Sequence, residues 1–326
     1  MHAVVVEQLG APEVLTLREV PEPQPGPGQV LIDTAYAGIN FAEIKARSVG
    51  YRVTGLPFVP GLEVSGLVRA VGAGVTGFRP GQPVAALLDT GGYAESVVAD
   101  AARTFSLPDG LDMRDAATVP SVLPTAYALV HHAGRLRAGE TVLVQGAAGG
   151  VGTALGQVAR LAGAARVYGV VSHPDKAKYA LDFGYDEVFA GGDFDGQLAR
   201  ATGGRGVDLV LDPVGGDTWR RGVASLARYG RAVSYGNAGD AEPWSAGFAD
   251  LAPRALSVSA FSILGLAAAD PQGLRDLTEA AFGLAATEGV RLPVTAEFPL
   301  EQAADAHRLV ESRSSTGKLL LRVNGH

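Results

Sequence analysis

A run of small residues between positions 144 and 152 could bind the pyrophosphate of a dinucleotide. It lies where Thr141–Gln145, which we expect to be a buried strand, gives way to apolar residues at helical spacing. Small residues let the backbone approach a phosphate, and the first amides of the following helix lie at its positive end. Ala147 replaces the first glycine of the G-x-G-x-x-G fingerprint, and Gly149 and Gly152 follow it. The residues predicted to bind the nucleotide are Gly146, Ala148, Gly149, Gly150, Val151 and Gly152.

The end of the next expected strand bears on the choice of dinucleotide. Enzymes that use NAD usually place Asp or Glu at this strand tip, where the carboxylate holds the ribose hydroxyls. Here Ser172 occupies the tip, and Lys176 follows four residues later. A neutral side chain and a nearby cation suit the 2'-phosphate of NADPH, although Lys176 and Lys178 could instead form the solvated face of a helix. We expect NADPH to bind in preference to NADH, with Asp175 weakening the discrimination.

Strands and helices along the chain must position these residues. Short β-patterned segments broken by glycine and proline occupy residues 1 to 120, which predicts an antiparallel, partly barrel-like domain. From 121 to 263 strand-like and helical segments alternate, which predicts one doubly wound parallel sheet of α/β class. Its six expected strands are Thr141–Gln145, Arg166–Ser172, Glu187–Ala190, Val207–Asp212, Arg231–Gly236 and Leu256–Ile263. The tail has helical patterns near Pro271–Thr287 and Leu300–Glu311 and a strand pattern at Lys318–Val323. Two helices and one strand cannot bury their apolar side chains alone, so we expect residues 264–326 to complete the first domain.

The composition argues against several classes of protein. The 326 residues are 47% hydrophobic, but no apolar run is long enough to cross a membrane. The formal net charge is −7 and there is no basic block, so neither nucleic acid nor an anionic membrane is an expected partner. Met1–Glu7 reaches a charge too early for a signal peptide, so we expect a cytoplasmic protein. The absence of cysteine excludes disulfides, thiolate-bound zinc and a cysteine nucleophile.

Seven motifs, in a fixed order, resemble those of a known family. They are Gly38–Phe41, Pro57–Gly66, Gly91–Glu95, Ala116–Ala117 with Thr125–Tyr127, Ala147–Gly152, Asp212–Gly216 and Thr316–Leu319. Together they resemble the zinc-independent medium-chain dehydrogenases/reductases, in particular NADPH quinone oxidoreductases of the zeta-crystallin type, over nearly the whole chain. The resemblance implies a GroES-like catalytic domain at 1–120, completed by 264–326, and a Rossmann domain at 121–263.

Zinc-dependent branches of that family hold their metal with a Gly-His-Glu segment and cysteines. The corresponding segment here is Gly61-Leu62-Glu63, and the chain has no cysteine, so we expect no metal. His131 and His132 are neighbours on an expected helix, where their side chains diverge. The other four histidines are isolated, and we expect them to be surface or capping residues: His2, His173, His307 and His326. Without a Lewis acid, hydride delivery to a conjugated acceptor is favoured over alcohol oxidation.

Two residues of the first domain are candidates for the chemistry. Asn40 matches the family asparagine beside the nicotinamide and its ribose. Tyr51 lies at the offset where related enoyl reductases carry a tyrosine proposed to protonate the product. A phenol with a pKa of about 10 can donate to an oxyanion while neutral, or Tyr51 could simply line an aromatic substrate wall. Lys45 and Arg47 could pair with Glu43 on a surface face or give the cleft a positive bias.

The resemblance assigns further cofactor contacts to loops at the carboxyl ends of the sheet strands, where doubly wound sheets bind ligands. Glycine turns of this kind also often serve packing alone. The residues assigned are Thr125, Gly215, Gly236, Asn237, Phe261, Ser262, Ile263 and, from the tail strand, Lys318.

These features predict an NADPH-dependent reductase that transfers hydride to a quinone or an α,β-unsaturated carbonyl compound bound between two domains. Two alternatives stay open, namely a trans-acting enoyl-thioester reductase and an abundant NADPH-binding structural protein with little turnover. The last expected strand of the sheet, Leu256–Ile263, would leave an exposed edge. Relatives pair this edge across a two-fold axis, so we expect a homodimer.

Overall fold

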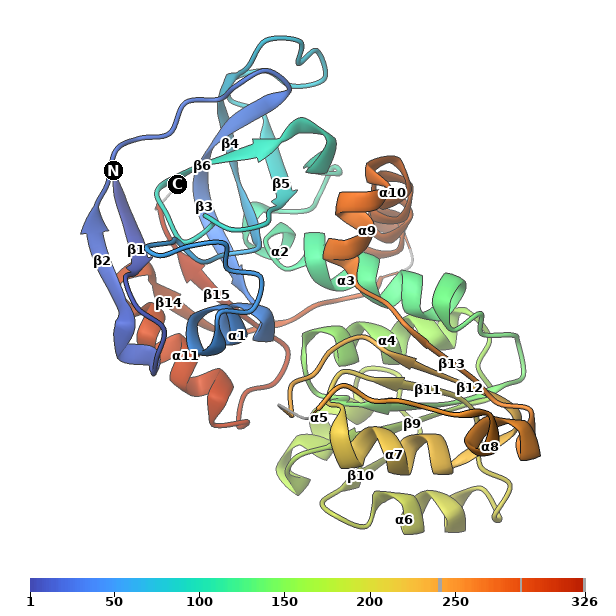
Figure 1. The fold of residues 1–326 in the computed structure, drawn as a ribbon. Coiled ribbons are helices and arrows are strands. Elements are labelled where there is room, and N and C mark those ends of the chain that lie inside the picture. Colours follow the sequence, from blue (N-terminus) through green and yellow to red (C-terminus); the bar gives the residue numbers. More distant parts are fainter. Residues whose placement is uncertain (240–241, 288, 325–326) are drawn as a thin grey trace. The chain divides into compact units, whose positions relative to one another are not determined.

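The computed structural model describes residues 1–239, 242–287 and 289–324. The chain divides into two units, one formed by Met1–Pro124 with Leu266–His326 and the other by Thr125–Gly265. Figure 1 shows the elements of both. Among the helices in the described residues, none combines the length and apolar character that crossing a membrane requires.

A parallel sheet forms the centre of the unit Thr125–Gly265. In the described residues it has six strands in the order β10-β9-β8-β11-β12-β13, and every neighbouring pair is parallel. The strands are β8 (Thr141–Gln145), β9 (Arg166–Val171), β10 (Glu187–Ala190), β11 (Val207–Asp212), β12 (Leu226–Ser234) and β13 (Ser257–Ala260). The predicted doubly wound sheet is therefore confirmed.

Helices cover both faces of this sheet. Figure 1 shows α4 (Gly150–Leu161) on one face and α6 (Phe194–Ala201) and α7 (Gly216–Ala224) on the other. The short helix α5 (Ala177–Leu181) connects β9 to β10. Because both faces are covered, β8 is apolar at its three central positions, and Val142, Leu143 and Val144 are fully buried.

Two strands of the sheet differ from their predicted bounds by more than one residue. β12 begins at Leu226 rather than Arg231, because Tyr229, with φ +64°, and Gly230 interrupt the apolar pattern without ending the strand. β13 ends at Ala260, and Ile263, which was expected to be the end of this strand, is instead the first residue of α9 (Ile263–Ala269). Neither change alters the order of the strands.

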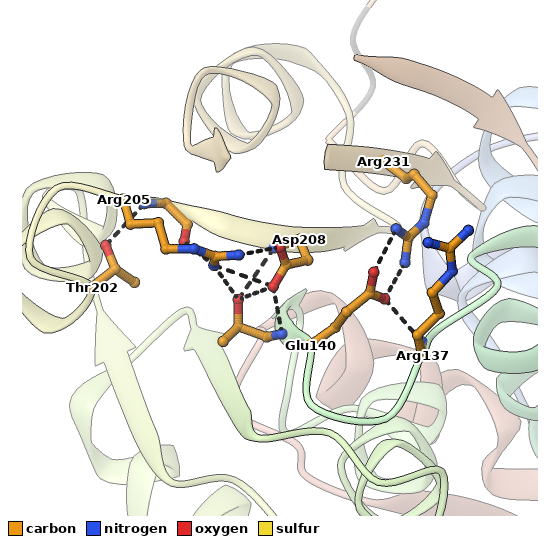
Figure 2. Close-up of polar contacts among 8 residues, drawn as sticks. Arg137, Glu140, Thr202, Arg205, Asp208 and Arg231 are labelled. Atoms are coloured by element: carbon orange, nitrogen blue, oxygen red, sulfur yellow. Dashed lines mark hydrogen bonds and ion pairs between the residues drawn. The ribbon is translucent and has the colours of Figure 1, made fainter. Parts of the chain in front are cut away.

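Ion pairs join strands at the amino end of the sheet, away from the strand carboxyl ends. Figure 2 shows Glu140, which precedes β8, receiving two hydrogen bonds from Arg231 of β12, at 3.0 and 2.5 Å. Asp208 of β11 accepts from Thr141 and from Arg205. These charge-assisted contacts hold β8, β11 and β12 together at the end opposite the glycine turn.

The other unit contains a second sheet, which in the described residues has seven strands. Its order is β14-β15-β3-β4-β5-β7, and β6 pairs with β3. The strands are β3 (Gln29–Ile39), β4 (Glu63–Val71), β5 (Pro83–Leu87), β6 (Ser96–Asp100), β7 (Thr104–Ser106), β14 (Val294–Pro299) and β15 (Lys318–Arg322). The strands from residues 1–120 pair antiparallel in this sheet, as expected, whereas β14 and β15, from the tail of the chain, pair in parallel. A separate hairpin consists of β1 (His2–Val6) and β2 (Leu15–Glu19).

This unit also contains several helices, of which α11 (Ala303–Glu311) contributes to its apolar core. The others are α1 (Phe41–Val49), α2 (Met113–Ala116) and α10 (Pro271–Thr287), and α3 (Val119–Ala128) spans the boundary between the units. The helix α8 (Phe248–Leu251) belongs to the other unit. The core combines side chains from β1, β3, β4, β15 and α11, including Val4, Ile32, Val64, Leu321 and Ala306. β15 and α11, which come from the segment after Leu266, thus pack in the same core as β3 and β4.

Candidate functional site

The glycine run forms a tight turn between β8 and α4. Gly146 has φ +67°, and the amide of Gly149 donates to the carbonyl oxygen of Gly146 at 3.0 Å. Gly149 is the N-cap residue of α4 and has no side chain that could bind the first amides of the helix. The amide of Thr153 donates to the carbonyl oxygen of Gly149 at 2.8 Å. Because the first amides of a helix have no partner within it, this helix start can receive the oxygens of a pyrophosphate.

Gly152 and Gly149 differ in what surrounds the position of a Cβ atom. A Cβ on Gly152 would collide with the carbonyl oxygen of Gly146, so Gly152 is required by packing within the turn. A Cβ on Gly149 would make only an ordinary contact of 3.4 Å, and this residue is exposed. The lack of a side chain at Gly149 therefore leaves room for a ligand rather than for the protein. Ala148 is buried, so it can contribute only its backbone.

The predicted specificity residues lie beside this turn. Ser172 directly follows β9, and Lys176 ends the short 3-10 turn Pro174–Lys176. The amide of Ala147 donates to the carbonyl oxygen of Val170 at 3.0 Å, which joins the glycine turn to the end of β9. Ser172 is exposed and Lys176 is half-buried.

The loops after β11 and β12 lie against each other. The buried carboxylate of Asp212 accepts from the amides of Val214, at 2.6 Å, and Gly215, at 2.7 Å, and so shapes the turn into α7. Burial raises the pKa of Asp212 to about 6, although these two hydrogen bonds oppose the shift. The side-chain oxygen of Asn237 lies 2.7 Å from where a Cβ of Gly215 would be, and Gly236 is exposed beside it. The structure therefore brings Gly215, Gly236 and Asn237 together.

The remaining assigned residues of this unit come from the segment after β13 and from α3. The amide of Phe261 donates to the carbonyl oxygen of Ser234 at 2.9 Å, which places it at the carboxyl end of β12. The hydroxyl of Ser262 accepts from the amide of Gly265 at 3.1 Å and helps begin α9, where Ile263 is the first residue. Thr125 is nearly buried within α3.

A buried polar cluster lies in the other unit, where β3, β4 and β15 meet. Lys318 is 2% exposed, and its ammonium donates to Glu63 Oε1 at 2.6 Å, to Asn40 Oδ1 at 2.7 Å and to the Ile39 carbonyl oxygen at 3.0 Å. An ammonium has three donors, so all three are used within the protein. A direct contact between Lys318 and a ligand would require one of these bonds to break.

Asn40 is held at both ends of its side-chain amide. Its Oδ1 accepts from Lys318, and its Nδ2 donates to Glu63 Oε1 at 2.9 Å and lies 3.5 Å from Glu43 Oε1. Its backbone amide donates to Glu43 Oε2 at 2.9 Å, as in the capping box that starts α1. The amide orientation is thus set by Lys318, Glu63 and Glu43, and one lone pair of Oδ1 remains for a ligand.

One of the two alternatives for Lys45 and Arg47, a surface face shared with Glu43, is wrong. Glu43 is 1% exposed and accepts from the amide of Leu62 at 3.0 Å, while burial raises its pKa to about 7 against the opposing charge of Lys318. Arg47 is fully buried and donates to the Gly10 carbonyl oxygen and to Glu311. Lys45 instead lies over the ring of Phe41. Buried partners from distant segments, rather than helical spacing, decide the positions of Glu43 and Arg47.

His307 was expected at the surface or as a cap, and that expectation is wrong. Its ring is fully buried and lies 3.2 Å, Nε2 to hydroxyl, from Tyr93. Burial, with a smaller effect of Arg47, lowers the pKa of His307 to about 3, so the ring is neutral. The two residues are 214 positions apart, and no local pattern could have paired them.

Tyr51 lies at the end of α1 opposite Asn40. It follows the cap residue Gly50, and its side chain is 48% exposed. The nine residues of α1 separate the two candidates by about 13 Å of helix. Val49, Gly50 and Val53, around Tyr51, line a surface pocket of about 390 Å³ together with Leu9 and three following residues. Tyr51 itself is not among the residues that line this pocket.

The polar cluster around Lys318 and Glu63 does not have the arrangement of a metal site. Within 1–239, 242–287 and 289–324, no three His, Cys, Asp or Glu side chains are arranged to hold a metal ion. The carboxylate of Glu63 is instead occupied by Lys318, Asn40 and the amide of Ser121, which donates to Glu63 Oε2 at 2.8 Å.

Comparison with known families finds two that together match most of the chain. Residues 26–109 match the alcohol dehydrogenase GroES-like domain, and residues 150–280 match the zinc-binding dehydrogenase family.

Individual proteins match over the full length. A quinone oxidoreductase of Pseudomonas aeruginosa is 34% identical over 322 residues, covering 96% of both chains. The structure of Escherichia coli quinone oxidoreductase complexed with NADPH superposes with a TM-score of 0.92 and 30% identity, covering 99% of this chain and 100% of that one. A phthioceranic/hydroxyphthioceranic acid synthase of Mycobacterium tuberculosis is 34% identical over 318 residues, which are 95% of this chain but 14% of the synthase.

Proposed function

The chain belongs to the zinc-independent quinone oxidoreductase type of the medium-chain dehydrogenases/reductases, and on that basis we propose that it is an NADPH-dependent reductase of quinones and conjugated carbonyl compounds. The relatives and the shared architecture support this proposal. The observation that carries it in this chain is the open start of α4, where Gly149 leaves space that the protein itself does not use.

NADPH is the cofactor that the residues around this turn fit. The amides at the start of α4 bind the pyrophosphate, and Gly146, Ala148, Gly150, Val151 and Gly152 shape the turn. Ser172 and Lys176, beside it, bind the 2'-phosphate. When bound, NADPH supplies the hydride that the acceptor receives.

The two units divide the work. The unit Thr125–Gly265 binds the dinucleotide, with Thr125, Gly215, Gly236, Asn237 and the backbone of 261–263 completing its contacts. The unit Met1–Pro124 with Leu266–His326 carries Asn40, Tyr51 and Lys318 and acts on the substrate. This assignment corresponds to the expected catalytic domain of 1–120 with 264–326 and nucleotide domain of 121–263.

Asn40 binds the reacting end of the cofactor through its side-chain oxygen. Because Nδ2 is engaged by Glu63 and Oδ1 already accepts from Lys318, the amide cannot rotate without losing charge-assisted hydrogen bonds. The remaining lone pair of Oδ1 suits a donor such as a ribose hydroxyl. Lys318 thus acts through Asn40.

Tyr51 has two possible roles in the reaction. Its half-exposed phenol can donate a proton to the oxyanion that hydride addition creates. The exposed apolar side chains of Val49 and Leu56, near it in the chain, equally support a role as part of a wall for an aromatic acceptor. Tyr51→Phe, which removes only the hydroxyl, distinguishes the two roles.

Reduction of an unsaturated acyl thioester is the second candidate function. It is favoured by the acid synthase of which one region resembles nearly the whole of this chain. A third possibility, an NADPH-binding structural protein, would bind the cofactor with little turnover.

One assay separates these functions. NADPH oxidation is followed at equal concentrations of 9,10-phenanthrenequinone, a simple enone and a crotonyl thioester. The proposal expects turnover with the quinone or the enone to exceed turnover with the thioester. Fastest turnover with the thioester would instead establish the second function. NADPH binding with negligible turnover on all three would leave the structural role.

We also propose a cytoplasmic homodimer that pairs through β13. This strand is the last in the sheet order and is largely exposed, and Phe248 nearby in the chain is 87% exposed. An open strand edge is a feature that proteins usually cover. Sedimentation at micromolar concentration should give the mass of a dimer, and Val258→Lys on β13 should shift it toward the monomer. A wild-type monomer at that concentration would contradict the proposal.

A further inference from the structure

Tyr185 lies between α5 and β10, and its side chain is 4% exposed. Its ring occupies space that two glycines leave open. A Cβ on Gly156 of α4 would lie 2.6 Å from Cε2 of the ring, and a Cβ on Gly169 of β9 would lie 2.9 Å from Cδ1. The ring is therefore inserted where α4 crosses β9, and neither glycine can gain a side chain without displacing it.

The hydroxyl of Tyr185 reaches the glycine turn itself. It donates to the carbonyl oxygen of Gly152 at 2.6 Å, in the first turn of α4. Gly152 packs against Gly146 and Ala147, so the bond connects Tyr185 to both ends of the turn. Burial raises the pKa of Tyr185 well above its ordinary value, and the phenol remains a donor at any working pH.

The backbone around Tyr185 is fastened to the same helix. Arg160 Nε donates to the carbonyl oxygen of Gly184 at 3.0 Å. Gly184 has φ +93°, and a Cβ there would lie 2.6 Å from the carbonyl oxygen of Gly156. Asp186, the next residue after Tyr185, pairs with Arg160 and accepts from the amide of Val167 at 2.7 Å. The segment 184–186 is thus fixed to α4 and β9, and Tyr185 has a rigid base.

We infer that Tyr185 is a positioning residue for cofactor binding, whose hydroxyl fixes the first turn of α4 so that its amides meet the pyrophosphate. The inference rests on the proposed binding of NADPH at this turn. Hydrogen bonds to phosphate oxygens weaken with displacements of a few tenths of an ångström, so the affinity depends on how the helix start is held. A ring that only filled space would leave this affinity unchanged when its hydroxyl is removed.

Tyr185→Phe tests the inference, because it keeps the ring and removes the hydroxyl. The matched control is Tyr168→Phe, a buried tyrosine of β9 whose ring stacks on Phe189. The dissociation constants of NADPH and of adenosine 2'-monophosphate, which lacks the pyrophosphate, are measured for wild type and both variants. The turnover number at saturating NADPH and the thermal midpoint without ligand are recorded as well.

We expect Tyr185→Phe to weaken NADPH binding by roughly three- to tenfold, the effect of one hydrogen bond. Binding of adenosine 2'-monophosphate, turnover at saturating NADPH and the control's affinities should remain within twofold of wild type. An unchanged NADPH affinity, or an equal loss for both nucleotides, overturns the inference while leaving the proposed function intact. A wild-type protein that does not bind NADPH overturns both.

Discussion

Lys318 Nζ lies 2.6 Å from Glu63 Oε1, and both side chains are removed from solvent. The two residues are 255 positions apart and come from β15 and β4. Their ion pair joins β15, near the end of the chain, to β4 of the same sheet. The side-chain amide of Asn40 is fixed by hydrogen bonds to both residues. Stability and site geometry therefore depend on the same contact.

Removing one member of this pair should be strongly destabilising. Lys318→Met leaves the carboxylate of Glu63 buried without its cation, which lowers the free energy of unfolding by about 3–5 kcal/mol. Urea titration measures the loss. Adding Glu63→Gln to Lys318→Met should recover part of the stability, because no bare charge then remains. The exposed pair Arg308–Glu13 serves as control, and Arg308→Met should leave the free energy of unfolding nearly unchanged. Equal losses for the two single variants would show that the buried pair has no special role.

Glu43 should make the protein less stable as the pH rises toward neutrality. Burial raises its pKa from 4.5 to about 7, so between these values the folded state keeps a proton that the unfolded state has lost. The free energy of unfolding then falls with increasing pH across this window and levels off above it. The change is about 3 kcal/mol.

Glu43→Gln removes this titration and should flatten the profile between pH 5 and 7.5. Asp212, whose pKa is raised to about 6, remains in both proteins and contributes a common slope. Urea unfolding at several pH values gives the comparison. Parallel profiles for the variant and wild type would mean that Glu43 titrates in its ordinary range.

The preference for NADPH should depend on Lys176. One charge-assisted contact to the 2'-phosphate favours NADPH over NADH by about 1–3 kcal/mol. Lys176→Ala should remove most of that difference, whereas Lys178→Ala, an exposed lysine two residues on, should preserve it. Fluorescence titration with both cofactors provides the dissociation constants. Equal or tighter binding of NADH by wild type would refute the assignment of Ser172 and Lys176.

Tyr51→Phe should distinguish a proton donor from a pocket wall. If the phenol donates a proton, enone reduction slows by about 10²–10⁴-fold while the NADPH dissociation constant is nearly unchanged. A quinone should suffer less, because its reduced oxyanion is a stabilised phenolate that water can protonate. Turnover is measured on both substrates with the same enzyme. Small and equal effects on the two would assign Tyr51 to the wall.

Chelation should not affect turnover. The carboxylate of Glu63 is already satisfied by Lys318, Asn40 and the Ser121 amide, and the chain has no cysteine to complete a zinc site. Elemental analysis should find no stoichiometric zinc, and dialysis against EDTA should leave quinone reduction at its original rate. One tightly held zinc per chain with chelator-sensitive activity would overturn this expectation.

The sequence by itself determined the features that depend on neighbouring residues. The apolar strand, glycine turn and apolar-striped helix at 141–161 are adjacent in the chain, so their spacing predicted the parallel sheet and the nucleotide turn. The order of the family motifs predicted the quinone oxidoreductase type, which the relatives confirm. These features can be predicted from the sequence because strand, turn and helix formation depend mainly on residues that are close together in the chain.

Only the tertiary structure decided which polar groups are buried and what they contact. Glu43, Arg47 and His307 would lie in water if helical spacing alone set their environment, yet partners from distant segments surround each of them. Tyr185 has no motif of its own and acquires its place from glycines on two other elements. A charged or hydroxyl side chain can be buried only where the fold supplies its partners, and those partners lie too far along the chain for any local pattern to reveal.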